Sequence, residues 1–167
     1  MKINKINKTN KKVAIVMGSQ SDYLVMKECE KILKILKIKY ETKIISAHRT
    51  PDRMFEFAKN ATKNNFAVIV AGAGGAAHLP GMIASMSILP IIGVPIETKK
   101  LKGLDSLLSI VQMPKGIPVG TVTIGKNGSF NAGLLAASII ALSESKIKKN
   151  LEKWRRLQTA AIKKKPK

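Results

Sequence analysis

The sequence contains a single cysteine, Cys29, and two histidines among its 167 residues. One cysteine excludes an internal disulfide framework and a zinc site built from several cysteines, and it is typical of a reducing compartment. Cys29 falls on the apolar face of a helical pattern, so we expect a small core residue rather than a nucleophile. Two histidines without neighbouring carboxylates do not favour a catalytic metal site.

Long apolar runs are also missing. The first twelve residues, MKINKINKTNKK, have no apolar core of the kind that a signal peptide carries. The other apolar stretches are broken by glycine and proline and are too short to span a bilayer. We therefore expect no membrane partner and a cytoplasmic protein.

Acidic residues are scarce: ten Asp and Glu residues stand against 30 Lys and Arg residues, which gives a formal net charge of +20. The excess gathers at the ends, because residues 1–12 hold five lysines and no acid, and residues 146–167 hold ten Lys or Arg against Glu152. Basic stretches of this kind are typical of proteins that bind the phosphate backbone of nucleic acids, but no nucleic-acid-binding module is recognisable in the sequence. We expect residues 1–12 to be a disordered basic arm, and we expect no specific nucleic-acid partner.

Between these ends, short apolar runs alternate with amphipathic segments. The runs fit strands buried in a parallel sheet, and the amphipathic segments carry apolar residues at helical spacing. The predicted strands are residues 13–17, 40–45, 66–71, 90–94 and, more weakly, 119–124, and the predicted helices are residues 24–36, 51–61, 83–86, 104–111 and 131–142. On the second of these helices, Met54, Phe55, Ala58 and Ala61 are expected to form the buried face. The alternation predicts one α/β domain over residues 13–145.

A further amphipathic helix is predicted after this domain. Ile147, Leu151, Trp154 and Leu157 form one apolar stripe on a basic background. The stripe is narrow, which favours docking on another protein surface over insertion into a membrane. We expect residues 146–167 to form a basic helix and tail that dock on a neighbouring subunit.

Two polar loops follow the first two predicted strands. In Gly18–Asp22 (GSQSD), the side chains of Ser19, Ser21 and Asp22 either cap the next helix or hold a phosphate or ribose. In residues 46–51 (SAHRTP), Thr50 and Pro51 predict a capped helix start. His48 and Arg49 lie off any apolar stripe, so we expect His48 to contact a ligand or catalyse, and the planar fork of Arg49 to bind phosphate.

A glycine-rich segment, VIVAGAGGAAHLPG over residues 68–81, begins in the third strand and runs past its predicted end, where Gly72, Gly74 and Gly75 are expected in the turn toward the next helix. Because ligands collect beyond the carboxyl ends of parallel strands, we expect Gly74 and Gly75 to form the floor of a site. His78 either caps or packs the next helix or contacts the ligand. The segment is neither the usual dinucleotide fingerprint nor a P-loop. Gly103 lies in a lysine-rich connection and is expected to accept a side chain.

Six segments together resemble the N5-carboxyaminoimidazole ribonucleotide mutase family, also called the catalytic subunit of phosphoribosylaminoimidazole carboxylase. They are GSQSD, SAHRTP, AGAGGAAHLPGM, GVP, LDSLLSIVQMPKGIPVGTV and NAGLLAA, in that order along residues 13–142. The resemblance implies a three-layer, flavodoxin-like parallel sheet with helices on both faces. It also implies a homo-octamer with sites at subunit junctions, and neither a metal nor an organic cofactor.

The resemblance further implies a purine-biosynthesis mutase that moves CO2 from the exocyclic nitrogen of its aminoimidazole substrate to a ring carbon. It would follow an ATP-dependent carboxyaminoimidazole ribonucleotide synthetase. By resemblance, His48 is the general acid and base, Ser19 and Asp22 bind phosphate and ribose, and Arg49 binds phosphate. The glycine backbone, Ser46, Ala47 and His78 would surround the imidazole and the migrating carboxylate, with loop N–H groups as donors.

Two other functions are compatible with the same residues. Close relatives that carboxylate aminoimidazole ribonucleotide directly with CO2 share most of these motifs, although the arginine of SAHRTP resembles the mutases. A non-catalytic, flavodoxin-like nucleotide-binding module would use the same crevice without proton transfer by His48.

Overall fold

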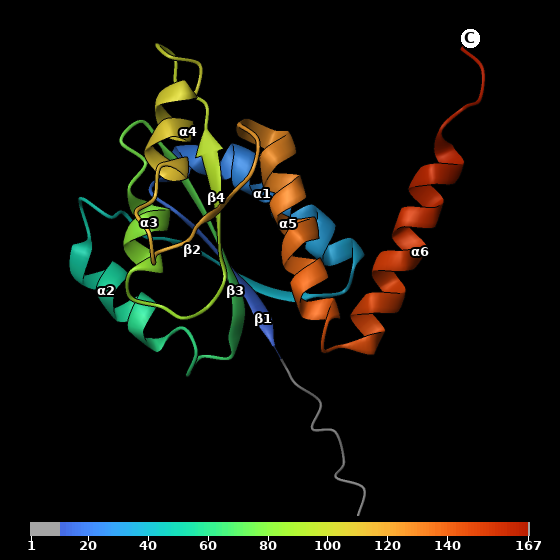
Figure 1. The fold of residues 1–167 in the computed structure, drawn as a ribbon, viewed down its shortest axis with the longest axis horizontal. Coiled ribbons are helices and arrows are strands. Elements are labelled where there is room, and N and C mark those ends of the chain that lie inside the picture. Colours follow the sequence, from blue (N-terminus) through green and yellow to red (C-terminus); the bar gives the residue numbers. More distant parts are fainter. Residues whose placement is uncertain (1–10, 167) are drawn as a thin grey trace, which may run out of the picture.

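The computed structural model describes residues 11–166, which form five strands and six α-helices (Figure 1). The strands are β1 Lys12–Met17, β2 Lys39–Ile44, β3 Phe66–Gly74, β4 Ile91–Ile96 and β5 Gly120–Thr121. The helices are α1 Tyr23–Ile35, α2 Pro51–Asn60, α3 Leu79–Ala84, α4 Leu104–Val111, α5 Gly125–Ala141 and α6 Ser145–Ala161, and a 3-10 turn, η1 Gln20–Asp22, precedes α1. Within the described range, no helix combines the length and apolar character needed to cross a membrane.

All five strands are parallel, and their order in the sheet is β2-β1-β3-β4-β5. This is the flavodoxin-like order, in which the direction of winding reverses between β1 and β3. Ligands of such sheets bind outside the carboxyl ends of the strands near that reversal. The predicted α/β, flavodoxin-like fold is therefore confirmed.

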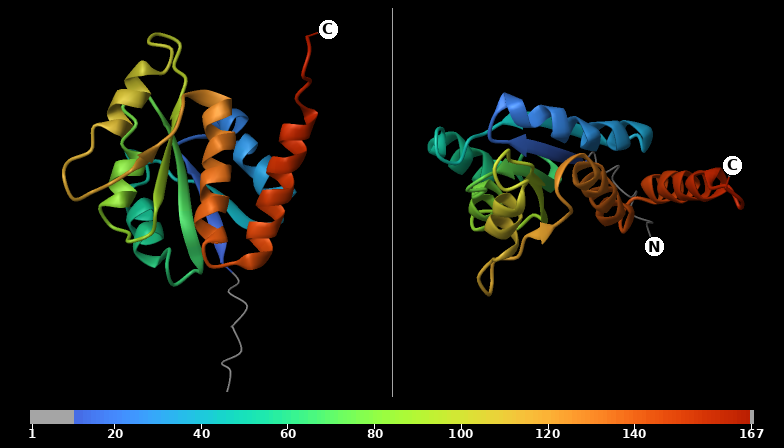
Figure 2. Two further views of the ribbon diagram at one scale, coloured as in Figure 1. Left: turned by 45° about the vertical axis from the view of Figure 1, so that its right-hand side comes forward. Right: turned by 90° about the horizontal axis from the view of Figure 1, so that it is seen from above.

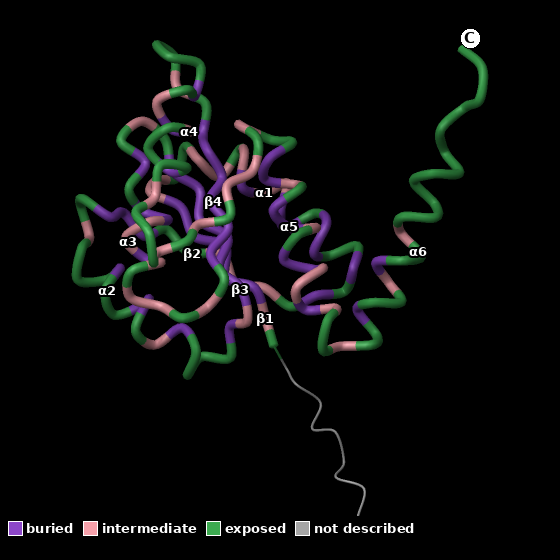
Figure 3. The backbone as a smooth tube through the Cα atoms, viewed as in Figure 1, coloured by how far each residue is buried: buried purple, intermediate pink, exposed green. Residues whose placement is uncertain are grey.

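Helices cover both faces of the sheet (Figure 2, right). Alternate residues of β1 point to opposite faces: Val13, Ile15 and Met17 pack in one core cluster with α1 and α5. Ala14 and Val16 pack in a second cluster with α2, α3 and the buried Ile110 of α4. The burial colours of Figure 3 show this continuous buried interior between the two helical layers. The molecule thus has the three layers that the resemblance implied.

Strand β3 continues to Gly74, three residues beyond its predicted end. Gly72, which we expected after the strand, lies within it. A Cβ built on Gly72 would lie 2.4 Å from Sδ of Met26, so this glycine allows α1 to pack closely on the sheet. Gly72 is therefore required by a tertiary contact between α1 and the sheet, and not by a turn as the sequence predicted.

Four other elements differ from the sequence-based expectation. Helix α3 covers Leu79–Ala84 rather than residues 83–86, because Pro80 occupies its first turn. Helix α5 begins at Gly125 rather than at residue 131, and β5 is reduced to two residues. On α2 the buried aromatic residue is Phe57, while Phe55 is 44% exposed. Cys29 is fully buried as expected, and burial raises the pKa of its thiol, which confirms a core residue rather than a nucleophile.

The basic arm predicted for residues 1–12 lies outside the described residues, apart from its last two. Of these, Lys12 opens β1, and its ammonium group pairs with the carboxylate of Glu41 on β2. The parallel sheet therefore begins one residue before the predicted strand.

Helix α6 leaves the body of the molecule after its first turns (Figures 1 and 2). Ile147 and Leu151 are buried in the core that α1 and α5 share, and Trp154 packs against Phe130 with ring centroids 6.1 Å apart. Leu157, by contrast, is 61% exposed. The first part of the predicted stripe thus serves the chain's own core, and only its distal part is left for a neighbour.

Candidate active site

A cleft of about 420 Å³ lies at the carboxyl ends of β1 to β4. It is formed by the loops after these four strands, as expected for parallel strands that end at one edge. Ser21 and Gly75 are not among its lining residues. Eight of the ten site residues predicted from the sequence line it: Ser19, Asp22, Ser46, Ala47, His48, Arg49, Gly74 and His78.

The loop after β1 forms a capping box. The Ser19 N–H donates to Oδ2 of Asp22 over 3.1 Å, and the Ser21 N–H donates to Oγ of Ser19 over 3.2 Å. This capping box closes the 3-10 turn η1, whereas α1 itself begins after Asp22 without a side-chain cap hydrogen bond. Both Ser19 and Asp22 line the cleft. Burial raises the pKa of the Asp22 carboxyl, although hydrogen bonds from Ser19 and Ser21 and the charge of Arg49 act in the opposite direction.

The loop after β2 is closed by Ser46 and Thr50. Oγ1 of Thr50 accepts from the Ser46 N–H and donates to the Ser46 carbonyl, both over 3.0 Å. Thr50 was expected to cap α2, but its side chain makes no cap hydrogen bond, because it is committed to this closure. The closed loop holds His48 and Arg49 at its exposed tip.

The guanidinium group of Arg49 connects the loops after β1 and β2. Its Nε donates to Oγ of Ser46 over 3.0 Å, and its Nη2 donates to the carbonyl of Gly18 over 2.7 Å. These bonds fix the plane of the guanidinium beside the N-terminal end of η1. The planar fork of a guanidinium held in this way suits an anion such as a phosphate.

The two histidines meet across the cleft. Nε2 of His48 and Nδ1 of His78 are 2.8 Å apart, and the rings are nearly perpendicular, with centroids 4.9 Å apart. One of these nitrogens carries the proton of the hydrogen bond and the other accepts it. The side chain of His78 makes no cap hydrogen bond to α3, so its partner is His48 rather than the helix. The arrangement orients an imidazole for proton transfer to a bound molecule.

The loop after β3, which contains Gly75, is hydrogen-bonded to helix α4. The Gly75 N–H donates to Oγ of Ser106 over 2.9 Å. We expected N–H groups of this loop to hold a ligand carboxylate, but the Gly75 amide is already bonded and is not available for that role. Oγ of Ser109 lies 3.2 Å from the Gly75 carbonyl. Sequence reasoning missed both serines, and the signal available was their i, i+3 spacing on an otherwise apolar helix.

The fourth wall of the cleft comes from the end of β4. Ile96, Glu97 and Thr98 line it and were not predicted as site residues. Ile96 ends β4, and Glu97 and Thr98 follow it directly, so the rule that placed the other loops at this edge also applied to them. Within residues 11–166, no three His, Cys, Asp or Glu side chains are grouped as metal ligands.

Gly103 is not the permissive position that we expected. It has a φ of +87°, and a Cβ there would lie 2.6 Å from Cγ2 of Ile124 and 3.2 Å from Cα of Glu97. Both the left-handed backbone and this contact oppose a side chain.

A family model of AIR carboxylases matches residues 12–161 of the chain. The protein belongs to the AIR carboxylase family. Two relatives are N5-carboxyaminoimidazole ribonucleotide mutases. That of Brucella melitensis is 54% identical over 154 residues, which are 92% of this chain and 95% of the relative. That of Escherichia coli K12 is 52% identical over 151 residues, or 90% and 89% of the two chains.

A solved structure has the same fold. The crystal structure of Treponema denticola PurE superposes with a TM-score of 0.79 at 26% sequence identity, and it covers 89% of this chain and 91% of that one. The family match spans all four loops that form the cleft, from Gly18 to Thr98. The resemblance found in the six sequence segments is thus confirmed over nearly the whole described chain.

Proposed function

We propose that this protein is a mutase of purine biosynthesis that converts N5-carboxyaminoimidazole ribonucleotide to 4-carboxy-5-aminoimidazole ribonucleotide. The observation that carries the proposal is the placement of His48, fixed by His78, in the same cleft as Arg49. Identities of 52% and 54% to two mutases, over about nine-tenths of the chain, support this substrate.

The proposed reaction needs one group that gives and then takes a proton. His48 donates a proton to the exocyclic nitrogen of the carbamate as the N–C bond breaks and CO2 leaves. The ring carbon then attacks CO2, and His48 removes the proton from that carbon. One proton is given and one is taken, so the reaction is an isomerisation without a co-reactant.

The rest of the cleft divides into a polar and an apolar side. We assign the phosphate to Arg49 and Ser19, whose loops are tied together by the bond to Gly18. The carboxylate of Asp22 would accept hydrogen bonds from ribose hydroxyls. Ala73, Gly74 and Ile96 would form the dry wall that retains CO2 until the ring carbon attacks.

Direct carboxylation of aminoimidazole ribonucleotide by CO2 is the second candidate, because the matching family is described as AIR carboxylase. An assay separates the two reactions: the protein is given either N5-carboxyaminoimidazole ribonucleotide or aminoimidazole ribonucleotide with bicarbonate, and the carbon-carboxylated product is measured by mass spectrometry. The mutase converts the first substrate rapidly at low bicarbonate. Conversion of only the second substrate contradicts the mutase, and conversion of neither leaves a nucleotide-binding module.

The Arg49→Ala variant is expected to raise KM by about 10–150-fold and to change kcat much less. A charge-assisted hydrogen bond contributes about 1.5–3 kcal/mol, and the phosphate is remote from the reacting atoms, so the loss is mainly in binding. The matched control is Arg53→Ala, because Arg53 on α2 donates to the carbonyl of Ile44, outside the cleft. Steady-state kinetics decide it: a large fall in kcat at unchanged KM argues against a phosphate-binding role.

We propose that the protein is a homo-oligomer of eight copies, as the family resemblance implies, and that the distal part of α6 docks on a neighbour. The exposed Leu157 and the half-exposed Trp154 on a projecting helix support this proposal. We further propose that it acts in the cytoplasm after an ATP-dependent synthetase, because forming the substrate's carbamate from bicarbonate requires an activated intermediate.

Removal of residues 155–167 is expected to shift the assembly toward smaller species. This truncation spares the buried Ile147 and Leu151 and the contact between Trp154 and Phe130, so the subunit should stay folded. Removal of residues 163–167 alone is the control for the loss of basic charge. Light scattering at micromolar concentration measures the mass, and a full-length protein that is already monomeric would defeat the proposal.

A further inference from the structure

Ser106 is a fully buried serine in the first turn of α4. Its hydroxyl donates to the carbonyl of Ile96 over 2.6 Å and accepts from the N–H of Gly75 over 2.9 Å. One side chain therefore satisfies two backbone groups from two different strand ends. Buried backbone groups need such partners, because an unpaired one retains its full cost of desolvation.

The two strand ends that Ser106 joins are neighbours in the sheet. Gly74 is the register partner of Ile96 at the carboxyl ends of β3 and β4, and both residues line the cleft. Gly75 comes directly after Gly74, where the chain turns away from the sheet with a φ of +69°. Ser106 thus fixes the wall of the cleft from the side that faces away from a ligand.

Packing alone does not hold Gly75 in its left-handed conformation. Apart from its two chain neighbours, no residue has a heavy atom within 4 Å of the position where its Cβ would be, so the space around it is open. What holds it is the hydrogen bond from its N–H to Oγ of Ser106. Oγ of Ser109 lies 3.2 Å from the Gly75 carbonyl, but its single proton has a shorter bond, 2.7 Å, to the carbonyl of Asp105 on its own helix. Ser106 therefore defines the orientation of the peptide group that precedes Gly75, and Ser109 supplies only a longer contact to the peptide group that follows it.

We propose that Ser106 is a positioning residue for the reaction: it acts through the backbone of Gly74 to Ala76 and does not touch the substrate. The inference rests on the proposed function. Without the hydroxyl, the Gly75 N–H and the Ile96 carbonyl turn toward water in the cleft, and the wall against the reacting atoms shifts. The proposed phosphate-binding residues Ser19 and Arg49 belong to other loops and keep their own hydrogen bonds.

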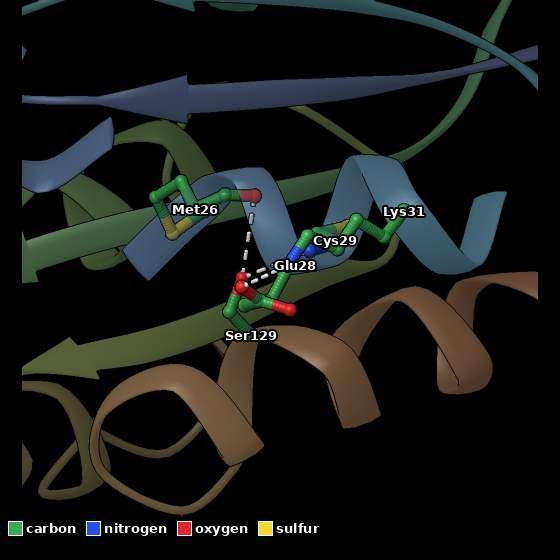
Figure 4. Close-up of polar contacts among 5 residues, drawn as sticks. All are labelled: Met26, Glu28, Cys29, Lys31 and Ser129. Carbon is green, nitrogen blue, oxygen red and sulfur yellow. Dashed lines mark hydrogen bonds and ion pairs between the residues drawn. The ribbon is translucent and has the colours of Figure 1, made fainter. Parts of the chain in front are cut away.

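Ser129 provides a matched control on the opposite face of the sheet (Figure 4). It is also fully buried, on α5. Its hydroxyl accepts from the N–H of Cys29 over 3.2 Å and donates to the carbonyl of Met26 over 3.3 Å, so it ties α5 to α1. It offers the same chemistry as Ser106 without any contact to the cleft.

The experiment compares Ser106→Ala with Ser129→Ala in the full-length protein. Ser106→Ala is expected to lower kcat by about 10²-fold, the effect of displacing reacting groups by about 1 Å, with KM unchanged within about threefold. Ser129→Ala should keep kcat within about twofold of the wild type, although both variants lose thermal stability. Ser106→Thr, which restores the hydroxyl, should recover most of the turnover. Equal kcat losses for the two alanine variants, or a kcat of Ser106→Ala near that of the wild type, overturn the inference.

A second readout separates this inference from the proposed function. Hydrogen exchange at the Gly75 amide, followed by NMR without ligand, should become at least about tenfold faster in Ser106→Ala and stay unchanged in Ser129→Ala. An unchanged Gly75 amide overturns the inference even if the enzyme is active. A wild type without turnover overturns the proposed function alone, since the exchange experiment still reports on Ser106. If Ser106→Ala does not fold, Ser106→Cys keeps the side-chain volume with a much weaker donor and acceptor, and the same two outcomes apply to it.

Discussion

His48→Asn is expected to lower kcat by about 10²–10⁴-fold, the contribution typical of a general acid and base, while nucleotide binding persists. The proposed isomerisation passes a proton through His48 twice, so no step bypasses it. His48 is exposed at the tip of a loop that Ser46 and Thr50 close, and its side chain contributes nothing to either core cluster. The variant should therefore fold normally. Asparagine keeps a polar group near His78 but cannot exchange a proton near neutral pH.

Calorimetric titration with the nucleotide and a thermal melt accompany the kinetic measurement. Wild-type affinity and melting temperature together with lost turnover identify His48 as the acid and base. Near-normal turnover in a homogeneous His48→Asn preparation removes it from the mechanism. A wild type that binds the nucleotide but never converts it supports a non-catalytic binding module instead.

The sequence was informative where local pattern and topology decide the structure. Helix α4 has the predicted bounds of residues 104 and 111, and Cys29 lies in the core, because apolar periodicity reports burial directly. The meeting of His48, Arg49 and Gly74 at one cleft also followed from the sequence, since loops after parallel strands share one edge of the sheet. None of these predictions required knowledge of a particular side-chain contact.

The predictions that differed depend on contacts between distant residues. A side chain at position 72 would collide with Sδ of Met26, and a side chain at position 103 would collide with Ile124. Because both partners are distant in sequence, the residues adjacent to each glycine do not reveal the collision. The same holds for the hydrogen bond between Ser106 and Gly75, which joins residues 31 positions apart. Thr50 is a residue type favoured as a helix cap, but its hydroxyl does not cap α2, because it accepts a hydrogen bond from the Ser46 N–H instead.

Gly74→Val is expected to reduce kcat/KM by about 10²-fold or more while the fold persists. Gly74 has no positive φ, and a Cβ there would meet nothing closer than Cβ of Ile96 at 3.4 Å, so the strand tolerates a side chain. The residue is nevertheless exposed to the cleft at the end of β3. The two methyl groups of valine would then fill space that the proposed mechanism reserves for CO2 and the carboxylate.

The control for Gly74→Val is Gly120→Val on β5. Gly120 is also an exposed strand glycine without a positive φ, and a Cβ there would lie 3.6 Å from the carbonyl oxygen of Ile91, so the two sites are sterically alike. Gly103→Val is unsuitable, because its clash with Ile124 would confound a loss of activity with a loss of stability. Turnover and melting temperature are measured for both variants. Since only Gly74 lines the cleft, Gly120→Val should keep most of the wild-type activity; the reverse result would mean that the active site has been assigned to the wrong loop.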